Sequence, residues 1–287
     1  MPPQAVRSGY IMNADNPLNY LEWGRVGAPV LVFIHAIRSP AYLWRRVAEG
    51  LEDRYRCVAI NLSGHGDSGP YPVREYNPEV WVDDLKAFSQ QLDLGPATIV
   101  TFSVVAAGCA VQFAASYPER TRALVLIDGG AGYLEERVAE ARTRMQAMPA
   151  EFPDWETALA FRLSMSDGAT APAGAWEERA PYLFRRLPDG KVVWKYDLLL
   201  QERWPGEDGF RNTGGHDSSV WERVQCPILV MKAHSPHLTP EDCDRIVQYG
   251  KGSRWVEVPS ETHFVFDENL EGLLERLEPF LEEVHRS

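Results

Sequence analysis

The sequence predicts an α/β protein built on a mostly parallel, doubly wound β-sheet, with a helical segment inserted between two of its strands. Short apolar runs alternate with amphipathic stretches along most of the 287 residues. This alternation stops over residues 131–222 and then resumes. Hydrophobic residues make up 45% of the chain, which is enough to bury a core on both faces of a sheet.

Apolar runs typical of buried strands occur six times in the sequence. These runs are Val30–Ile34, Cys57–Ile60, Thr98–Phe102, Ala123–Ile127, Ile228–Met231 and Trp255–Val258. Helices are expected over Pro78–Leu92, Val104–Tyr117, Pro240–Gly250 and Glu268–Val284. Pro78 suits the first turn of its helix, where a backbone N–H is not needed. Strands that alternate with helices imply a parallel sheet covered on both faces.

Residues 131–222 contain helical patterns over Tyr133–Met148 and Trp155–Met165, and no run typical of a strand. We therefore expect a core domain of residues 1–130 and 223–287, with residues 131–222 inserted as a helical cap after the strand that ends at Asp128. A separate small domain is the alternative. Some aromatic side chains of the cap should line an apolar pocket, and most should pack within the cap. These aromatic residues are Phe152, Trp155, Phe161, Trp176, Tyr182, Phe184, Trp194, Tyr196 and Trp204.

The composition disfavours several classes of partner. The chain has 29 Lys and Arg against 41 Asp and Glu, a net charge of -12, and no basic patch that would suit nucleic acid. Its four cysteines form no CxxC pair, which indicates free thiols in a reducing compartment. The N-terminus lacks the pattern of a signal peptide, and the longest apolar stretch is about half of a membrane span. We expect a cytoplasmic protein with a small-molecule substrate; a homodimer is left open.

The first chemical feature is a serine at the junction between a strand and a helix. The apolar strand that ends at Phe102 runs directly into Ser103 and a helix of small residues. Such a turn exposes a hydroxyl at the carboxyl end of a sheet, beside a helix N-terminus that stabilises negative charge. Thr101 and Val105 stand where a G-x-S-x-G motif has its glycines. Taken alone, the serine is better interpreted as the N-cap of a buried helix.

Three other segments lie at the ends of predicted strands. Phe33–Ala36, which reads Phe-Ile-His-Ala, ends the first predicted strand, and Asn61–Gly69, which reads Asn-Leu-Ser-Gly-His-Gly-Asp-Ser-Gly, follows the next one. Pro259–Phe264, which reads Pro-Ser-Glu-Thr-His-Phe, follows the last strand. Together with the serine turn, these segments resemble the α/β-hydrolase superfamily, in the same order over nearly the whole chain. Lys191–Asp197 also looks like a cap segment of capped bacterial members.

This resemblance implies roles for particular residues. Ser103 would be the nucleophile and His263 its general base. Backbone N–H groups of Ala36 and Val104 would form the oxyanion hole, which tolerates alanine at position 36 because the donors are backbone groups. No cofactor and no metal are implied. The side chains expected at the substrate are His35, Phe102, Trp155, Trp194 and Phe264.

The third member of the triad is missing from its usual place. The superfamily usually has an aspartate after the strand Ile228–Met231, but residues 232–238 contain no carboxylate. Asp128, at the end of an earlier strand, is the expected substitute because some members supply the acid from there. The alternative is a structural aspartate in the turn before two glycines. Glu261 and Asp267 lie too close to His263 in the sequence to reach its far nitrogen.

The departures from the usual motifs cluster in one site, which indicates chemistry that has changed from ordinary ester hydrolysis or been lost. The leading hypothesis is Ser-His hydrolysis of an ester, lactone or carbon–carbon bond in a hydrophobic or aromatic substrate. A second is a cofactor-independent oxygenase, lyase or cyclase that uses His263 and Asp128 as its base. The third is an inactive ligand-binding protein. A metal site at His234 and His237, with His35 or His263, is disfavoured because no carboxylate or cysteine joins them.

Overall fold

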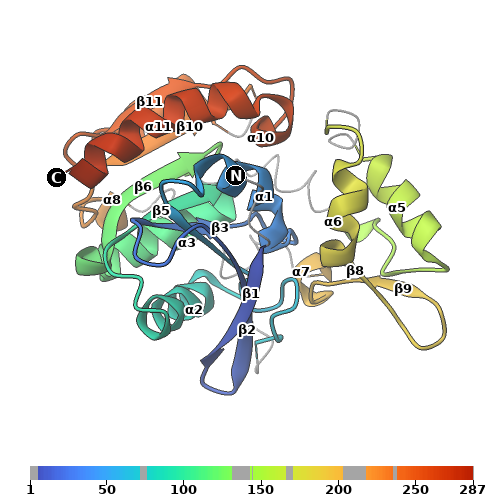
Figure 1. Cartoon of the computed structure of the whole chain (residues 1–287). Coiled ribbons are helices and arrows are strands. Elements are labelled where there is room, and N and C mark those ends of the chain that lie inside the picture. The colour runs from blue at the N-terminus through green and yellow to red at the C-terminus, as the bar shows by residue number, and fades with distance from the viewer. Residues whose placement is uncertain are drawn as a thin grey trace.

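A computed structural model describes residues 6–71, 76–130, 143, 145–165, 171–202, 218–234 and 238–286 of the chain. Its centre is an eight-stranded sheet in the order β1-β2-β4-β3-β5-β6-β10-β11 (Figure 1). The strands are β1 Arg7–Asn13, β2 Asn16–Trp23, β3 Val30–Ile34, β4 Arg56–Ile60, β5 Ala97–Phe102, β6 Thr121–Ile127, β10 Ile228–Lys232 and β11 Arg254–Glu257. All pairings from β4 to β11 are parallel, so the predicted sheet is confirmed.

Two strands at one edge were not predicted. β1 and β2 form an antiparallel hairpin, and β2 pairs antiparallel with β4. The hairpin turns at Ala14, whose φ of 51° lies in the left-handed region. β1 is mostly exposed, so its sequence lacks the apolar run that marks a strand buried on both faces.

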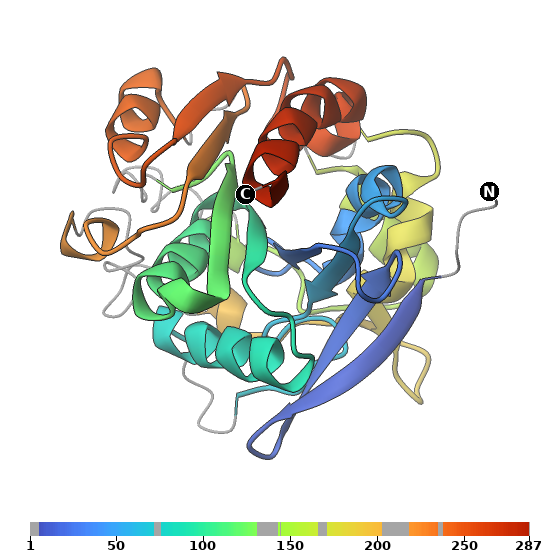
Figure 2. The ribbon, with the colours of Figure 1, turned by 60° about the vertical axis from the view of Figure 1, so that its left-hand side comes forward.

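Helices cover both faces of the sheet, as a doubly wound fold requires. They are α1 Arg45–Leu51, α2 Pro78–Gln91, α3 Ser103–Ser116, α9 Pro240–Ile246, α10 Val265–Glu268 and α11 Leu270–Arg286, with short helices η1 Ala41–Trp44, η2 Pro118–Arg120 and α8 Ser218–Trp221. α2 and α3 pack on one face, and α1 and α11 pack on the other (Figure 2).

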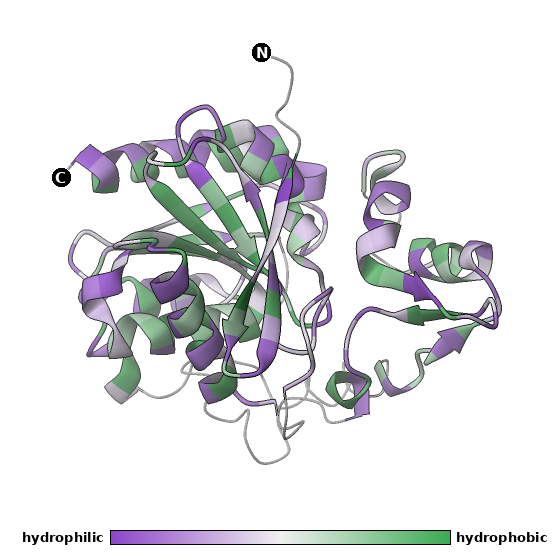
Figure 3. Cartoon of the chain, turned by 60° about the horizontal axis from the view of Figure 1, so that its bottom comes forward, coloured by the Kyte–Doolittle hydropathy of each residue, from purple (hydrophilic) through white to green (hydrophobic). Residues whose placement is uncertain are grey.

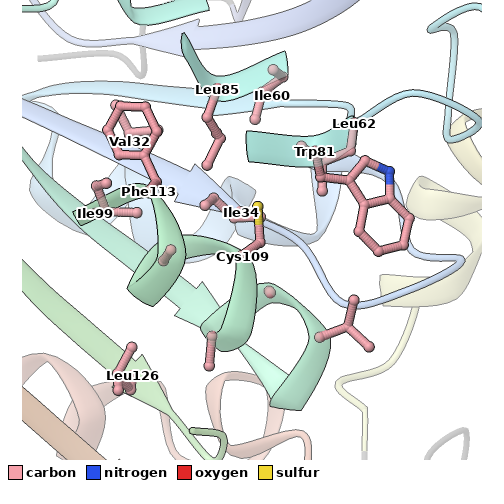
Figure 4. Close-up of a cluster of buried hydrophobic side chains, with 14 of the residues drawn as sticks. Val32, Ile34, Ile60, Leu62, Trp81, Leu85, Ile99, Cys109, Phe113 and Leu126 are labelled. Atoms are coloured by element: carbon pink, nitrogen blue, oxygen red, sulfur yellow. The ribbon is translucent and has the colours of Figure 1, made fainter. Parts of the chain in front are cut away.

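Successive residues of the strands enter opposite halves of the core. Val32 and Ile34 of β3 point toward α2 and α3, in the cluster that also holds Trp81 and Phe113 (Figure 4). Leu31 and Phe33, by contrast, pack with α1 and α11. This alternation explains why each strand reads as a continuous apolar run, and the hydropathy colouring shows the same apolar centre (Figure 3).

The segment between β6 and β10 corrects the expectation of a purely helical cap. It contains helices α5 Trp155–Leu163, α6 Ala175–Leu183 and α7 Leu199–Glu202, but also strands β7 Glu151–Phe152, β8 Phe184–Arg186 and β9 Val192–Trp194. These strands form an antiparallel sheet in the order β7-β9-β8. Each has only two or three residues, too short for a periodicity to be read. The turn sequence Pro188-Asp189-Gly190 was the available signal for the β8–β9 hairpin.

The cap boundaries at residues 131 and 222 stay a prediction, and most of the expected helix Tyr133–Met148 lies outside the described residues. α5 matches the helix expected over Trp155–Met165. The described part of residues 131–222, for which we keep the predicted name cap, stands beside the carboxyl edge of the sheet (Figure 1).

Candidate active site

The register of the parallel strands brings Ser103 and Asp128 together. Phe102, the last residue of β5, pairs with Ile127, the last residue of β6. Ser103 and Asp128 are therefore the next residues along two neighbouring strands. Both leave the sheet in the left-handed region, with φ of 74° at Ser103 and 47° at Asp128. For residues other than glycine this backbone conformation costs free energy, of the order of 1 kcal/mol or more each.

The Ser103 turn forms without the two glycines of the usual motif. Thr101 and Val105 are both buried, and the Thr101 hydroxyl donates to the Val125 carbonyl over 3.3 Å. The glycine that this turn needs lies in the turn after the neighbouring strand, β6. A Cβ at Gly129 would stand only 2.4 Å from the Ser103 carbonyl oxygen, so no larger residue fits there without displacing the turn.

His263 lies against the same two strand ends. Its Nδ1 donates a hydrogen bond to Asp128 Oδ2. Asp128 is fully buried, and its other carboxylate oxygen accepts the backbone N–H of Ala233, just after β10, over 3.3 Å. The ring of His263 lies against that of Phe102, with centroids 4.3 Å apart and the ring planes tilted by 31°. Since Phe102 directly precedes Ser103, the serine, the histidine and the aspartate lie at the same part of the sheet edge.

This geometry defines the tautomer of the histidine. When neutral His263 carries its proton on Nδ1 for Asp128, Nε2 has the lone pair of a base. A buried carboxylate on Nδ1 also stabilises the imidazolium that forms when Nε2 takes a proton. The arrangement can therefore accept a proton from a hydroxyl and return it to a leaving group. The predicted pairing of Asp128 with His263 is present; a catalytic role for it remains a proposal.

The family model for the α/β hydrolase fold matches residues 29–270. The chain belongs to this family. It is similar to an esterase of Mycobacterium tuberculosis, with 26% identity over 271 residues that cover 90% of this chain and 84% of that protein. It also resembles a 2-(acetamidomethylene)succinate hydrolase of Mesorhizobium japonicum, 30% identical over 145 residues, which is half of each chain.

Solved structures show the same fold. A crystal structure of an E-2-(acetamidomethylene)succinate hydrolase superposes with a TM-score of 0.81. The match covers 97% of this chain and 100% of the other at 23% sequence identity, so it supports the fold alone.

His35 does not have the position in this α/β hydrolase that the sequence suggested. It is 1% exposed, its Nδ1 donates to the Ala36 carbonyl over 2.8 Å, and its Nε2 accepts the Leu62 N–H over 3.1 Å. Burial lowers the pKa of His35 to about 4, which keeps the ring neutral. Both ring nitrogens are thus used to join two backbone loops, and the expectation of a substrate contact is wrong.

Phe102 and Trp194 are likewise packing residues. Phe102 is fully buried beneath His263, with its ring 5.2 Å from that of Phe264. Trp194 is 4% exposed, and its indole N–H donates to the Pro149 carbonyl over 2.8 Å. The expected substrate contacts of these two residues are therefore corrected, because each is covered by other side chains of the described chain.

Trp155 and Phe264 are half-buried. The ring of Trp155, on α5, lies against Phe184 of β8, with Arg186 over it at 5.6 Å, so it packs on the small sheet of the cap. Phe264 lies between Phe102 on the core side and Trp176 of the cap, which is 6.4 Å away edge to face. Of the five predicted substrate contacts, Phe264 alone directly follows the histidine and faces the cap.

The backbone donors proposed for the oxyanion hole remain predictions. Ala36 is buried in the turn after β3, where its carbonyl accepts hydrogen bonds from His35 Nδ1 and from the Ser39 N–H. Val104 lies in the first turn of α3, where backbone N–H groups have no partner within the helix. Both positions flank the Ser103 turn along the carboxyl edge, because β3 and β5 are neighbours in the sheet.

Sequence reasoning missed two carboxylates that hold the site loops. Glu268 accepts the backbone N–H of Thr262 over 3.0 Å and also the hydroxyl of Thr262, and so closes the turn that carries His263. Asp84, on α2, accepts the N–H and hydroxyl of Ser63 over 2.8 and 2.9 Å. Burial raises the pKa of Asp84. The short distance in sequence between Glu268 and His263 was the only signal for the first; nothing pointed to the second.

Within the described part of the chain, no cluster of three His, Cys, Asp or Glu side chains could hold a metal ion. His234 is exposed, with its backbone N–H on the Ser260 hydroxyl, and His237 lies outside the described residues. No helix among the described residues is long and apolar enough to cross a membrane.

Proposed function

We propose that this protein is a serine hydrolase that cleaves an acyl bond, of the ester type, in a small organic molecule. Ser103 is the nucleophile, His263 the general base and Asp128 the residue that orients and stabilises the histidine. The observation that carries the proposal is the hydrogen bond from His263 Nδ1 to the buried Asp128, directly beside a serine held at a φ of 74°.

In the proposed reaction, Ser103 Oγ attacks the carbonyl carbon of the substrate while His263 Nε2 takes the hydroxyl proton. The negative oxygen of the tetrahedral intermediate accepts the N–H groups of Val104 and Ala36. His263 then gives its proton to the leaving group, and the acyl-enzyme forms. Water, activated by the same nitrogen, attacks the acyl carbon and releases the acid and free Ser103.

The unusual origin of the acid is compatible with this mechanism. Asp128 extends from the end of β6, which is the neighbour of both β5 and β10. It can therefore reach the histidine without a carboxylate in the loop after β10. That loop instead donates the Ala233 N–H to Asp128, which helps to hold the carboxylate in its position beside His263.

The backbone strain at Ser103 favours a nucleophile over a simple helix cap. An N-cap serine has extended backbone angles, and its side chain accepts a helix N–H. Here the preceding residue, Phe102, has the extended angles of the N-cap, and Ser103 takes the left-handed conformation. Strained residues of this kind cluster at active sites, where they aim a reacting group. The esterase and hydrolase among the relatives support the same reaction class.

A fluorophosphonate probe tests the proposal directly. We expect it to label Ser103 stoichiometrically, with the site mapped by mass spectrometry, and to fail on Ser103→Ala. Ser116→Ala is the matched control, because this exposed serine ends the same helix α3. The wild type should also hydrolyse p-nitrophenyl acetate, and Ser103→Ala should retain less than about 10⁻³ of that kcat. Labelling that persists in Ser103→Ala would reject the serine as nucleophile.

A second function is favoured by the acid on β6: a base-driven oxygenase, lyase or cyclase in which His263 and Asp128 remove a substrate proton and Ser103 only orients the substrate. It predicts no labelling by the probe and a substrate turnover that survives in Ser103→Ala but not in His263→Ala. Tight ligand binding with no turnover by either route would instead indicate a binding protein.

A further inference from the structure

A buried ion pair joins the cap to the segment that follows His263. Arg179 lies on α6 of the cap, and Asp267 lies on α10, four residues after the histidine. The guanidinium binds both carboxylate oxygens, with Arg179 Nη1 2.6 Å from Asp267 Oδ2. The two side chains are 4% and 0% exposed. Figure 1 shows α6 facing α10 across the junction of the two parts.

From this geometry we infer that Arg179 and Asp267 are positioning residues that hold His263 on Asp128 when the cap is seated. This inference rests on the proposed function, because it assigns the pair to the proposed general base. Neither Arg179 nor Asp267 is one of the three residues that carry out the proposed reaction.

Backbone hydrogen bonds connect the ion pair to the histidine. The Asp267 N–H donates to the Phe264 carbonyl over 2.9 Å, and the Val265 N–H donates to the His263 carbonyl over 3.0 Å. A shift of Asp267 is therefore transmitted through one short turn to the histidine. Arg46, on α1, donates to the carbonyls of Phe266 and Asp267 over 3.4 and 3.3 Å and holds the core side of the same turn.

The cap also touches this turn through aromatic rings. Arg179 lies over the ring of Trp176, 4.8 Å from its centroid, and Trp176 packs edge to face against Phe264. Phe264 in turn contacts Phe102, the residue under the His263 ring. The cap thus reaches the His263 turn by two routes, one charged and one apolar, and both start from α6.

The chemistry of the pair suits orientation better than stability. A buried ion pair contributes little net stability, because desolvation of two charges offsets their attraction. The planar, two-pronged contact between a guanidinium and a carboxylate does fix relative orientation. Such a pair beside a catalytic base is expected to act on geometry, and misplacement by about 1 Å costs about 10²-fold in rate.

The adjacent residue on α6 provides a matched control. Glu178 forms an ion pair with Arg45, so it also joins the cap to the core. Its side chain is 59% exposed. Its partner Arg45 also binds Glu49 and Tyr42, whereas the residue of α1 that reaches the turn 263–267 is the next one, Arg46. Glu178→Gln therefore removes a tether between cap and core from the same helix without touching the histidine turn.

The experiment compares Asp267→Asn with Glu178→Gln in the full chain, with two readouts. The first is kcat and KM for p-nitrophenyl acetate, normalised to folded protein. The second is the low-field proton NMR resonance of His263 Nδ1–H, assigned by its loss in His263→Gln. We expect Asp267→Asn to lower kcat about 10²-fold with KM little changed, and to broaden or abolish the resonance. Glu178→Gln should leave both unchanged.

A second variant covers the case in which a lone buried Arg179 prevents folding. The double change Arg179→Gln with Asp267→Asn removes both charges, so no uncompensated charge is left in the interior. We expect it to fold and to show the same weakened resonance and lowered kcat. An unchanged resonance and kcat in a folded variant would overturn the inference.

The two proposals fail in different ways. If the wild type neither reacts with the fluorophosphonate probe nor hydrolyses the ester, the proposed function fails, but the resonance still tests the positioning. If Ser103 is labelled and the resonance of Asp267→Asn matches the wild type, only the positioning inference fails.

Discussion

His263 and His35 stand at the same edge of the sheet, yet their surroundings differ in every respect that matters for chemistry. His263 is partly exposed and pairs with a carboxylate. His35 is buried, and both of its ring nitrogens bind backbone groups. The first ring has the partner that the proposed general base needs, and the second joins two loops. The comparison shows that a histidine near an active site is assigned by its partners and not by its place on the fold.

The largest effect should come from removing the carboxylate that distinguishes the two histidines. In Asp128→Asn we expect kcat to fall about 10⁴-fold, because an amide no longer selects the tautomer or stabilises the imidazolium. Esterase kinetics on the purified variant measure this, and urea unfolding is the control. A folded Asp128→Asn protein with wild-type kcat would show that the carboxylate partner does not give His263 a role different from that of His35.

At His35 we expect a smaller effect, on the stability of the fold and not on activity. His35→Ala should lower the free energy of unfolding by about 2–4 kcal/mol, because the buried Leu62 N–H loses its acceptor and a cavity forms. Its kcat per folded molecule should change much less than that of His263→Ala, which in turn should unfold nearly like the wild type. A His35→Ala protein that is as stable as the wild type but inactive would contradict the structural role assigned to His35.

The third prediction concerns pH. Burial lowers the pKa of His35 to about 4 from a usual 6.5, and it also lowers that of His65. The unfolded chain therefore binds more protons than the folded chain between about pH 6.5 and 4, so stability falls as the pH falls through this window. For His35 alone the loss approaches about 3 kcal/mol at the acid end.

Unfolding in urea at pH 7.5 and pH 5 measures this loss. His35→Ala is the control, because it lacks one of the titrating rings and should show a shallower dependence. Asp84 acts in the opposite direction: its raised pKa means that the folded state gains stability as that carboxyl takes up a proton. Stability that stays level from pH 7.5 to 5 in the wild type would contradict the neutral state of the two buried histidines.

Much of the fold could be read from the sequence, because strands buried on both faces leave continuous apolar runs. All six predicted strands are present within a residue or two of their expected ends. β1 was missed since it is an exposed edge strand, and β8 and β9 were missed since they are too short to show a period. An exposed strand and a strand of three residues both lack the long apolar run by which a buried strand is recognised in a sequence.

The site could be predicted in part. The place of Asp128 at a strand end, together with the resemblance to family members that supply the acid from there, predicted its pairing with His263, and the hydrogen bond between the two is present. The same reasoning failed for His35 and Phe102, which also lie at that edge but point into the core. A strand end specifies the neighbourhood of a residue, whereas the direction of its side chain depends on contacts made by distant segments, such as the Leu62 N–H on His35.

The glycine after Asp128 has a consequence for how this site can change over evolution. Gly129 lies so near the Ser103 carbonyl that no side chain fits between them. It also directly follows Asp128, the residue that binds His263. The turns after β5 and β6 are thus interlocked: neither can move, lengthen or acquire a bulkier residue alone. New specificities in this protein should therefore arise by variation in the cap, while the two turns are inherited as a unit.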